Sequence, residues 1–132
     1  MKRILRMAIV AAICIPGLSF AAAQGPLPLK KGTYVLIDTV PCEDAPFAAV
    51  FDYDGHSLSG PHESRCTSVL LERHGREYRI RTTCTALGDG TPTPSSTETQ
   101  SYRLISPTEV AVSRSDRSNE LTYRLCPAWS AK

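Results

Sequence analysis

The segment from Asp52 to His56 carries the residues whose types and spacing are best suited to binding a ligand. Alternate residues of an extended chain point the same way, so Asp52 and Asp54 could present two carboxylates to a hard cation, with His56 nearby. Calcium takes about six to eight oxygen ligands, and no further acidic residue follows at the spacing of a known calcium loop. Asp54-Gly55 also favours a tight hairpin turn. We interpret the segment as a turn first and as a possible binding site second, and we predict no metal centre.

The three histidines are the other candidates for chemistry: His56, His62 and His74. His62 and Glu63 lie close to serines, but catalytic groups of this kind converge from distant segments, and the chain has no Gly-x-Ser-x-Gly elbow. We therefore predict that the protein is not an enzyme and uses no cofactor, with a small hydrolase as the least favoured alternative. His62 stays a possible binding residue.

Arg79 and Arg81 share one face of an expected strand, with Arg73 on the neighbouring strand. Together they could contact an acidic partner or a carboxylate ligand, and we list Arg79 and Arg81 as possible binding residues. The alternative is that they form the solvated side of a half-buried sheet.

The first 23 residues predict where the protein is delivered. Lys2, Arg3 and Arg6 precede an apolar run, and Ala21-Ala22-Ala23 follows it, which is the pattern of a cleaved secretory signal peptide. The run is shorter than the roughly 20 residues of a membrane span. We expect cleavage after Ala23 and a periplasmic or secreted protein without a membrane span.

The charge balance changes once this leader is set aside. Three of the fifteen basic residues lie in it, which leaves twelve against thirteen acidic residues. A mature chain that is close to neutral lacks the clustered positive charge that a nucleic-acid backbone requires. We predict no nucleic-acid partner and expect a monomer.

Four cysteines remain in the mature chain: Cys42, Cys66, Cys84 and Cys126. An even number in a small exported domain indicates two disulfides, and no pair has the Cys-x-x-Cys spacing typical of zinc sites. Three connectivities are possible. We favour Cys66–Cys84 with Cys42–Cys126, while the pairings of Cys42 with Cys66 or with Cys84 stay open.

The hairpin from Cys66 to Cys84 supports this preference. A three-residue turn over 74–76 would place Cys66 opposite Cys84 on the core-facing side, close enough to bridge. The same register pairs Thr67 with Thr83, Ser68 with Thr82, Val69 with Arg81, Leu70 with Ile80, Leu71 with Arg79, and Arg73 with Glu77.

The rest of the mature chain consists of short β-branched and aromatic runs separated by Gly, Pro, Asp and Ser. Strands are expected over 33–40, 48–53, 56–58, 98–105, 109–114 and 121–125, with a long polar loop over 87–97. In the last three strands, Tyr102 and Leu104 should face Val112 and Val110, which in turn should face Tyr123 and Leu125. Trp129 is expected to cap one end of the core.

These elements predict one all-β domain over 32–132, preceded by an extended arm over 24–31. About six to eight antiparallel strands in about 100 residues make a small barrel or sandwich, stapled by the two disulfides.

Several short motifs are distributed over this domain. They are Leu29–Tyr34 (Leu-Lys-Lys-Gly-x-Tyr), Cys42 with Ala45–Ala48, the Tyr53–Gly55 turn, Gly75-x-x-Tyr78 and Cys84. The pattern loosely resembles a group of small exported proteobacterial proteins with no assigned activity. In architecture it is similar to the periplasmic lysozyme inhibitors, which are disulfide-linked β-barrels that insert loops into an enzyme cleft. Their Ser-Gly motif has a Tyr three residues after the Gly, whereas Ser59-Gly60 is followed there by Glu63, so no site residue carries over.

Two non-enzymatic functions fit these observations. The favoured one is a binding or inhibitor-like module that acts on another secreted or periplasmic protein. The alternative is an envelope protein that binds a small molecule or an ion, which requires a barrel wide enough to leave a cavity.

Overall fold

The computed structural model describes residues 25–38, 41–114 and 119–130. The predicted signal peptide over 1–23 and its cleavage site lie outside the described residues. Within the described ranges, no helix is long and apolar enough to cross a membrane.

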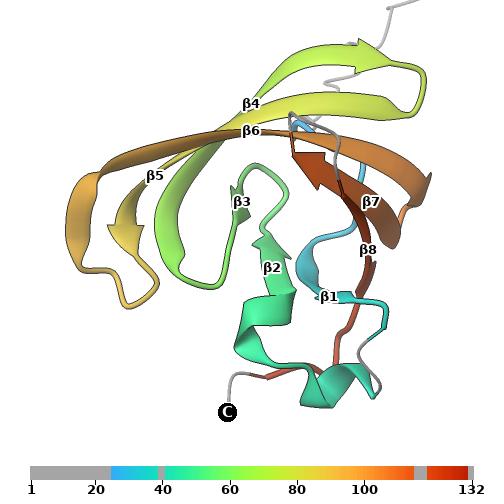
Figure 1. Cartoon of the computed structure of the whole chain (residues 1–132), viewed down its shortest axis with the longest axis horizontal. Coiled ribbons are helices and arrows are strands. Elements are labelled where there is room, and N and C mark those ends of the chain that lie inside the picture. The colour runs from blue at the N-terminus through green and yellow to red at the C-terminus, as the bar shows by residue number, and fades with distance from the viewer. Residues whose placement is uncertain (1–24, 39–40, 115–118, 131–132) are drawn as a thin grey trace, which may run out of the picture.

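Eight antiparallel strands form a single sheet (Figure 1), which confirms the all-β prediction. Their order in the sheet is β3-β2-β1-β8-β7-β6-β5-β4. The strands are β1 (Gly32–Leu36), β2 (Val50–Tyr53), β3 (Leu58–Ser59), β4 (Glu63–His74), β5 (Glu77–Leu87), β6 (Pro92–Ser106), β7 (Glu109–Arg114) and β8 (Glu120–Leu125). Two short 3₁₀ helices, η1 (Cys42–Asp44) and η2 (Phe47–Ala49), join β1 to β2.

The sheet curls into a nearly closed barrel whose seam lies between its two end strands, β3 and β4. A side chain bridges this seam, because the backbone N–H of Leu58 donates to Ser68 Oγ at 2.9 Å. The same Ser68 hydroxyl lies 2.8 Å from Thr82 Oγ1 on β5. Ser68 therefore connects β3, β4 and β5 at the point where the barrel closes.

The β4–β5 hairpin has the expected register from Cys66↔Cys84 to Leu70↔Ile80. Nearer the turn the prediction is wrong, because a register shift at Leu71 pairs Glu72 with Arg79 and Arg73 with Tyr78. The turn contains two residues instead of three. Gly75 has a φ of 60°, which the first residue of a type II′ turn requires and which glycine adopts without strain.

The polar loop expected over 87–97 is mostly strand, which corrects the prediction. Strand β6 begins at Pro92, which pairs with Ala86 of β5, and residues 96–99 pair with residues 81–84 beyond a register shift. Strand β7 pairs with β6 only from Gln100 onward. At Pro92 and Pro94 the β6 backbone therefore has no paired strand on that side. Proline is tolerated at such an edge because its missing N–H removes no hydrogen bond there.

In the meander of β6, β7 and β8, the predicted register is correct between β6 and β7 and wrong between β7 and β8. Tyr102 pairs with Val112 as expected, but Val110 pairs with Tyr123, where Leu125 was expected. The slip is two residues, which keeps every side chain on its predicted face, because side chains alternate along a strand. The connection over 115–118 that sets this register lies outside the described residues.

The first strands are shorter than predicted. β1 ends at Leu36, and residues 39–40 of the expected strand lie outside the described part of the chain. β2 begins at Val50, because Phe47–Ala49 form η2, in which the Ala49 N–H donates to the Pro46 carbonyl at 2.8 Å. The expected return over 56–58 is β3 (Leu58–Ser59), which begins two residues later and ends one residue later than predicted.

The segment before β1 packs into the barrel. Leu27 and Leu29 are buried in the main core, which also contains Tyr34 and Tyr53. The Tyr53 hydroxyl donates to the Leu27 carbonyl at 2.7 Å, and the Tyr34 hydroxyl donates to the Lys30 carbonyl at 2.7 Å. These bonds hold the segment in place and fill that part of the core.

The disulfides have the favoured connectivity, Cys42–Cys126 and Cys66–Cys84. Cys126 lies in a second core cluster with Val35, and Trp129 packs against that cluster. The Trp129 indole N–H donates to the Ala45 carbonyl at 3.0 Å, which confirms the expected capping role.

Candidate ligand pocket

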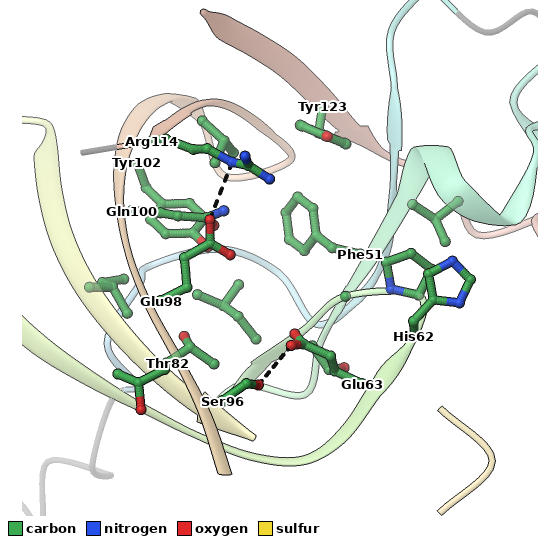
Figure 2. Close-up of a pocket in the computed structure, with 18 of the residues that line it drawn as sticks. Phe51, His62, Glu63, Thr82, Ser96, Glu98, Gln100, Tyr102, Arg114 and Tyr123 are labelled. Carbon is green, nitrogen blue, oxygen red and sulfur yellow. Dashed lines mark hydrogen bonds and ion pairs between the residues drawn. The ribbon is translucent and has the colours of Figure 1, made fainter. Parts of the chain in front are cut away.

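An open pocket of about 650 Å³ lies on the inner side of the barrel (Figure 2). Its volume falls within the range of about 300–1,000 Å³ that is usual for small-molecule sites. The lining comes from β2, β5, β6, β7 and β8, together with β3 and the connection that leads into β4. The segment from Leu58 to Glu63 forms one side of the pocket, beside the seam of the barrel.

Strand alternation positions the lining residues. Four alternate side chains of β6 face the pocket: Ser96, Glu98, Gln100 and Tyr102. The neighbouring strands add inward residues at matching register positions, since Ile80 pairs with Gln100 and Tyr102 pairs with Val112. The inner face therefore changes along β6 from aromatic at Tyr102 to polar at Ser96.

A row of packed aromatic rings forms one wall. The ring of Phe51 stacks on Tyr34 with centroids 5.1 Å apart, and its edge meets Tyr123 at the same distance. Phe51 and Tyr123 both line the pocket, and Val50 and Leu58 add aliphatic surface. A ligand with a flat apolar body would find a preformed surface here.

Two carboxylates lie among the polar lining residues. Glu98 forms an ion pair with Arg114, with Oε1 and Nε 3.3 Å apart, and Glu63 accepts a hydrogen bond from Ser96 Oγ at 2.9 Å. Figure 2 shows the two groups on different parts of the pocket surface. Glu63 comes from the start of β4, whereas Glu98 and Arg114 come from β6 and β7.

The pocket tyrosines are neutral hydrogen-bonding groups at neutral pH. Burial, and then the nearby charge of Glu98, raise the pKa of Tyr102 well above its usual range. Burial also raises the pKa of Tyr123. The Tyr102 hydroxyl donates to Gln100 Oε1 at 2.7 Å, which fixes both side chains.

Asp52 and Asp54, two of the predicted binding residues, are used by the fold. Asp54 Oδ1 accepts hydrogen bonds from the backbone N–H groups of His56 and Ser57, both at 2.7 Å, and closes the β2–β3 turn. Asp52 accepts a hydrogen bond from the Thr33 hydroxyl across β1 and β2. Neither residue lines the pocket.

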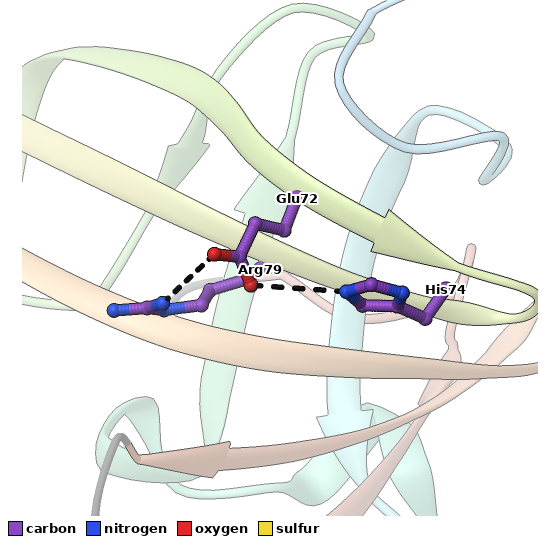
Figure 3. A network of polar contacts seen from close by, with 3 residues as sticks. All are labelled: Glu72, His74 and Arg79. Atoms are coloured by element: carbon purple, nitrogen blue, oxygen red, sulfur yellow. Dashed lines mark hydrogen bonds and ion pairs between the residues drawn. The ribbon is translucent and has the colours of Figure 1, made fainter.

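Arg79 and Arg81 are exposed and lie outside the pocket lining. Arg79 Nη1 lies 3.3 Å from Glu72 Oε1, and His74 Nε2 lies 3.9 Å from the other carboxylate oxygen of Glu72 (Figure 3). Surface ion pairs of this kind contribute little to stability. The role of Arg79 and Arg81 as binding residues stays a prediction.

His62 is the one predicted binding residue that lines the pocket. Its ring meets the edge of Phe47, with centroids 5.6 Å apart, and no hydrogen bond joins it to a described carboxylate. Among the described residues, the only histidine–carboxylate ion pair is that of His74 and Glu72. The described residues thus contain no histidine-based catalytic triad.

One group of side chains in the described ranges has ligating atoms close enough for a metal: Cys42, Glu43 and Cys126. Both cysteines are joined in a disulfide, so neither offers a thiolate to an ion.

No protein-family model matches this chain, and neither a curated protein nor a solved structure matches it. The resemblance to small exported proteobacterial proteins and to lysozyme inhibitors stays a prediction.

Most residues of the pocket were not predicted from the sequence. Glu98, Gln100 and Tyr102 were assigned to a strand but not to a site, because neither strand alternation nor hydropathy shows where a barrel leaves space. One signal was present. Polar residues continue on the same strand face as a core tyrosine, which is typical of an inner face that approaches the open end of a barrel.

Proposed function

We propose that this protein is a non-enzymatic exported module that binds a small molecule in the barrel pocket. The observation that carries the proposal is the 650 Å³ pocket, which combines an apolar aromatic wall with a few polar side chains. This composition is usual in small-molecule sites, where apolar surface supplies affinity and polar groups fix orientation. The two disulfides support export, because such bonds persist in oxidising compartments.

A pocket-filling variant tests this proposal. Val112 lines the pocket on β7, so we expect Val112→Trp to occupy the space and abolish ligand binding. Arg81→Trp adds the same ring on the exposed face of β5 and serves as the matched control. Native mass spectrometry after incubation with a metabolite extract should show a small-molecule adduct in the wild type and the control only.

Two results would contradict the proposal. One is an adduct that persists in Val112→Trp when circular dichroism shows that variant to be folded. The other is a wild-type protein that takes up nothing from extracts of its own organism's envelope and growth medium.

A protein partner is the second candidate function, and one observation favours it. Val69, Leu70 and Leu71 are 45%, 41% and 38% exposed, and they are consecutive residues of β4 at the end of the sheet order. Apolar residues on an end strand are a usual feature of protein-binding surfaces. A partner at this surface should be lost in Leu70→Asp and retained in Val112→Trp.

A further inference from the structure

The pocket contains one carboxylate without a cationic partner, and this asymmetry bears on the charge of the ligand. Glu98 is offset by Arg114, whereas Glu63 accepts a hydrogen bond from the Ser96 hydroxyl. The other carboxylate oxygen of Glu63 lies 3.7 Å from Cys84 Sγ, which is part of a disulfide and has no proton to donate. In the described part of the chain, no basic nitrogen lies within ion-pair distance of Glu63. With His62 neutral, the lining therefore carries one excess negative charge.

The geometry disfavours an inorganic cation as the ligand. Calcium and magnesium need several oxygen ligands that converge on one point. Neither Glu63 nor Glu98 belongs to a group of three ligating side chains among the described residues. A single unpaired carboxylate instead suits an ammonium group, which needs one charged acceptor and a few neutral ones.

The aromatic wall suits the rest of such a ligand. The ring centroids of Phe51 and Tyr123 lie 5.1 Å apart, and Tyr102 lines the same pocket. Aromatic faces attract cations through their quadrupole and also pack against hydrocarbon. The pocket thus combines a negative group with surfaces that accept both a cation and an apolar body.

We propose that the pocket selects small amphipathic organic cations, in which a protonated amine contacts Glu63 and an apolar body lies against Phe51 and Tyr123. The inference rests on the proposed small-molecule function and adds the charge and shape of the ligand. Arg114 is the cation that an anionic ligand would need, and it is engaged by Glu98.

Three probes with one carbon skeleton test the charge: 4-phenylbutylamine, 4-phenylbutan-1-ol and 4-phenylbutyrate. Binding to the full oxidised protein is followed by nitrogen-edited NMR at pH 7 and low salt. We expect the amine to bind about threefold to fivefold more tightly than the alcohol, as is usual for a half-exposed ion pair, and the acid to bind most weakly. Added salt should reduce the difference.

Two variants extend the test. Glu63→Gln should remove the preference for the amine over the alcohol and leave the affinity for the alcohol unchanged. The double variant E63Q/E98Q leaves Arg114 as the only charged lining side chain, with His62 neutral, so it should favour the acid over the amine. Glu43→Gln, which changes an exposed carboxylate outside the pocket, is the control and should behave as the wild type.

The possible failures are distinguishable. Equal affinities for amine and alcohol, tightest binding of the acid, or an equal effect of Glu43→Gln would overturn the charge inference. In those cases a saturable change at the pocket amides would still support the small-molecule function. If none of the three probes perturbs the pocket, both proposals are overturned.

Discussion

At the scale of single residues, Asp54 shows how a side chain suited to ligand binding can be used by the backbone. Its Oδ1 atom accepts two backbone hydrogen bonds in the β2–β3 turn, where Gly55 has a φ of 95°. These bonds, first from Ser57 and then from His56, lower the pKa of Asp54 below its ordinary value of 3.8. The carboxylate therefore stabilises the turn in its charged form.

The Asp54→Ala variant should be less stable than the wild type by about 1–2 kcal/mol at pH 7, as is found when a similar capping side chain is lost. The folded pKa of Asp54 is lowered, so its charged form stabilises the protein above pH 3.8. That contribution is lost as the pH falls through the lowered value. Urea unfolding of both proteins between pH 7 and pH 2 should show the difference shrinking at the acid end.

Asp54→Asn is the control for this prediction. It keeps an oxygen acceptor and does not ionise, so it should retain most of the stability at pH 7. The stability difference between Asp54→Asn and Asp54→Ala should not change with pH. A pH-independent difference between the wild type and Asp54→Ala would show that the charge of Asp54 has no role.

At the scale of elements, β3 and β4 form no ladder in the described chain, and a side-chain hydrogen bond joins them instead. β3 has two residues, and its Leu58 N–H is satisfied by Ser68 Oγ instead of by a ladder partner. Leu58 itself is buried in the main core and lines the pocket. The closure of the barrel and the shape of the pocket therefore depend on the same hydroxyl group.

Ser68→Ala should destabilise the protein by about 1–3 kcal/mol, because it leaves a buried N–H without an acceptor. Hydrogen exchange should report the loss locally as faster exchange of the Leu58 amide. Thr67→Ala changes the next side chain of β4, which is exposed, and should leave that exchange rate unaltered. Equal protection of Leu58 in Ser68→Ala would mean that the seam does not depend on the hydroxyl.

Elements also show how far the sequence predicts this fold. Matched pairs such as Ser68–Thr82 gave the correct hairpin register up to Leu70, because side-chain alternation and cross-strand matching act locally. The prediction failed at Pro92–Thr97, where proline and polar residues suggest a loop but the edge position tolerates them. The pocket depends on how strands β2 to β8 curve around a common space, which no local pattern records.

At the scale of the whole molecule, the two disulfides constrain the chain over very different lengths. Cys42–Cys126 closes a separation of 84 residues and joins the β1–β2 connection to the segment after β8. Cys66–Cys84 closes a separation of 18 residues between strands that the ladder already pairs. The entropy removed from the unfolded chain grows with the logarithm of the loop length.

Removal of Cys42–Cys126 by paired Ala substitutions should therefore cost more stability than removal of Cys66–Cys84, at about 4.6 against about 3 kcal/mol on the chain-entropy model. Denaturant unfolding of the two double variants measures the difference. A greater loss on removing Cys66–Cys84 would show that this bridge acts in the folded state, beside the Glu63 side of the pocket.

The most direct test of the central claim, that the barrel pocket binds small molecules, is an NMR titration of the oxidised protein with 4-phenylbutan-1-ol. We expect saturable shifts at the amides of Thr82, Glu98 and Val112, which line the pocket, and their loss in Val112→Trp. Shifts that never saturate, or saturable shifts confined to Val69–Leu71 on β4, would contradict the claim.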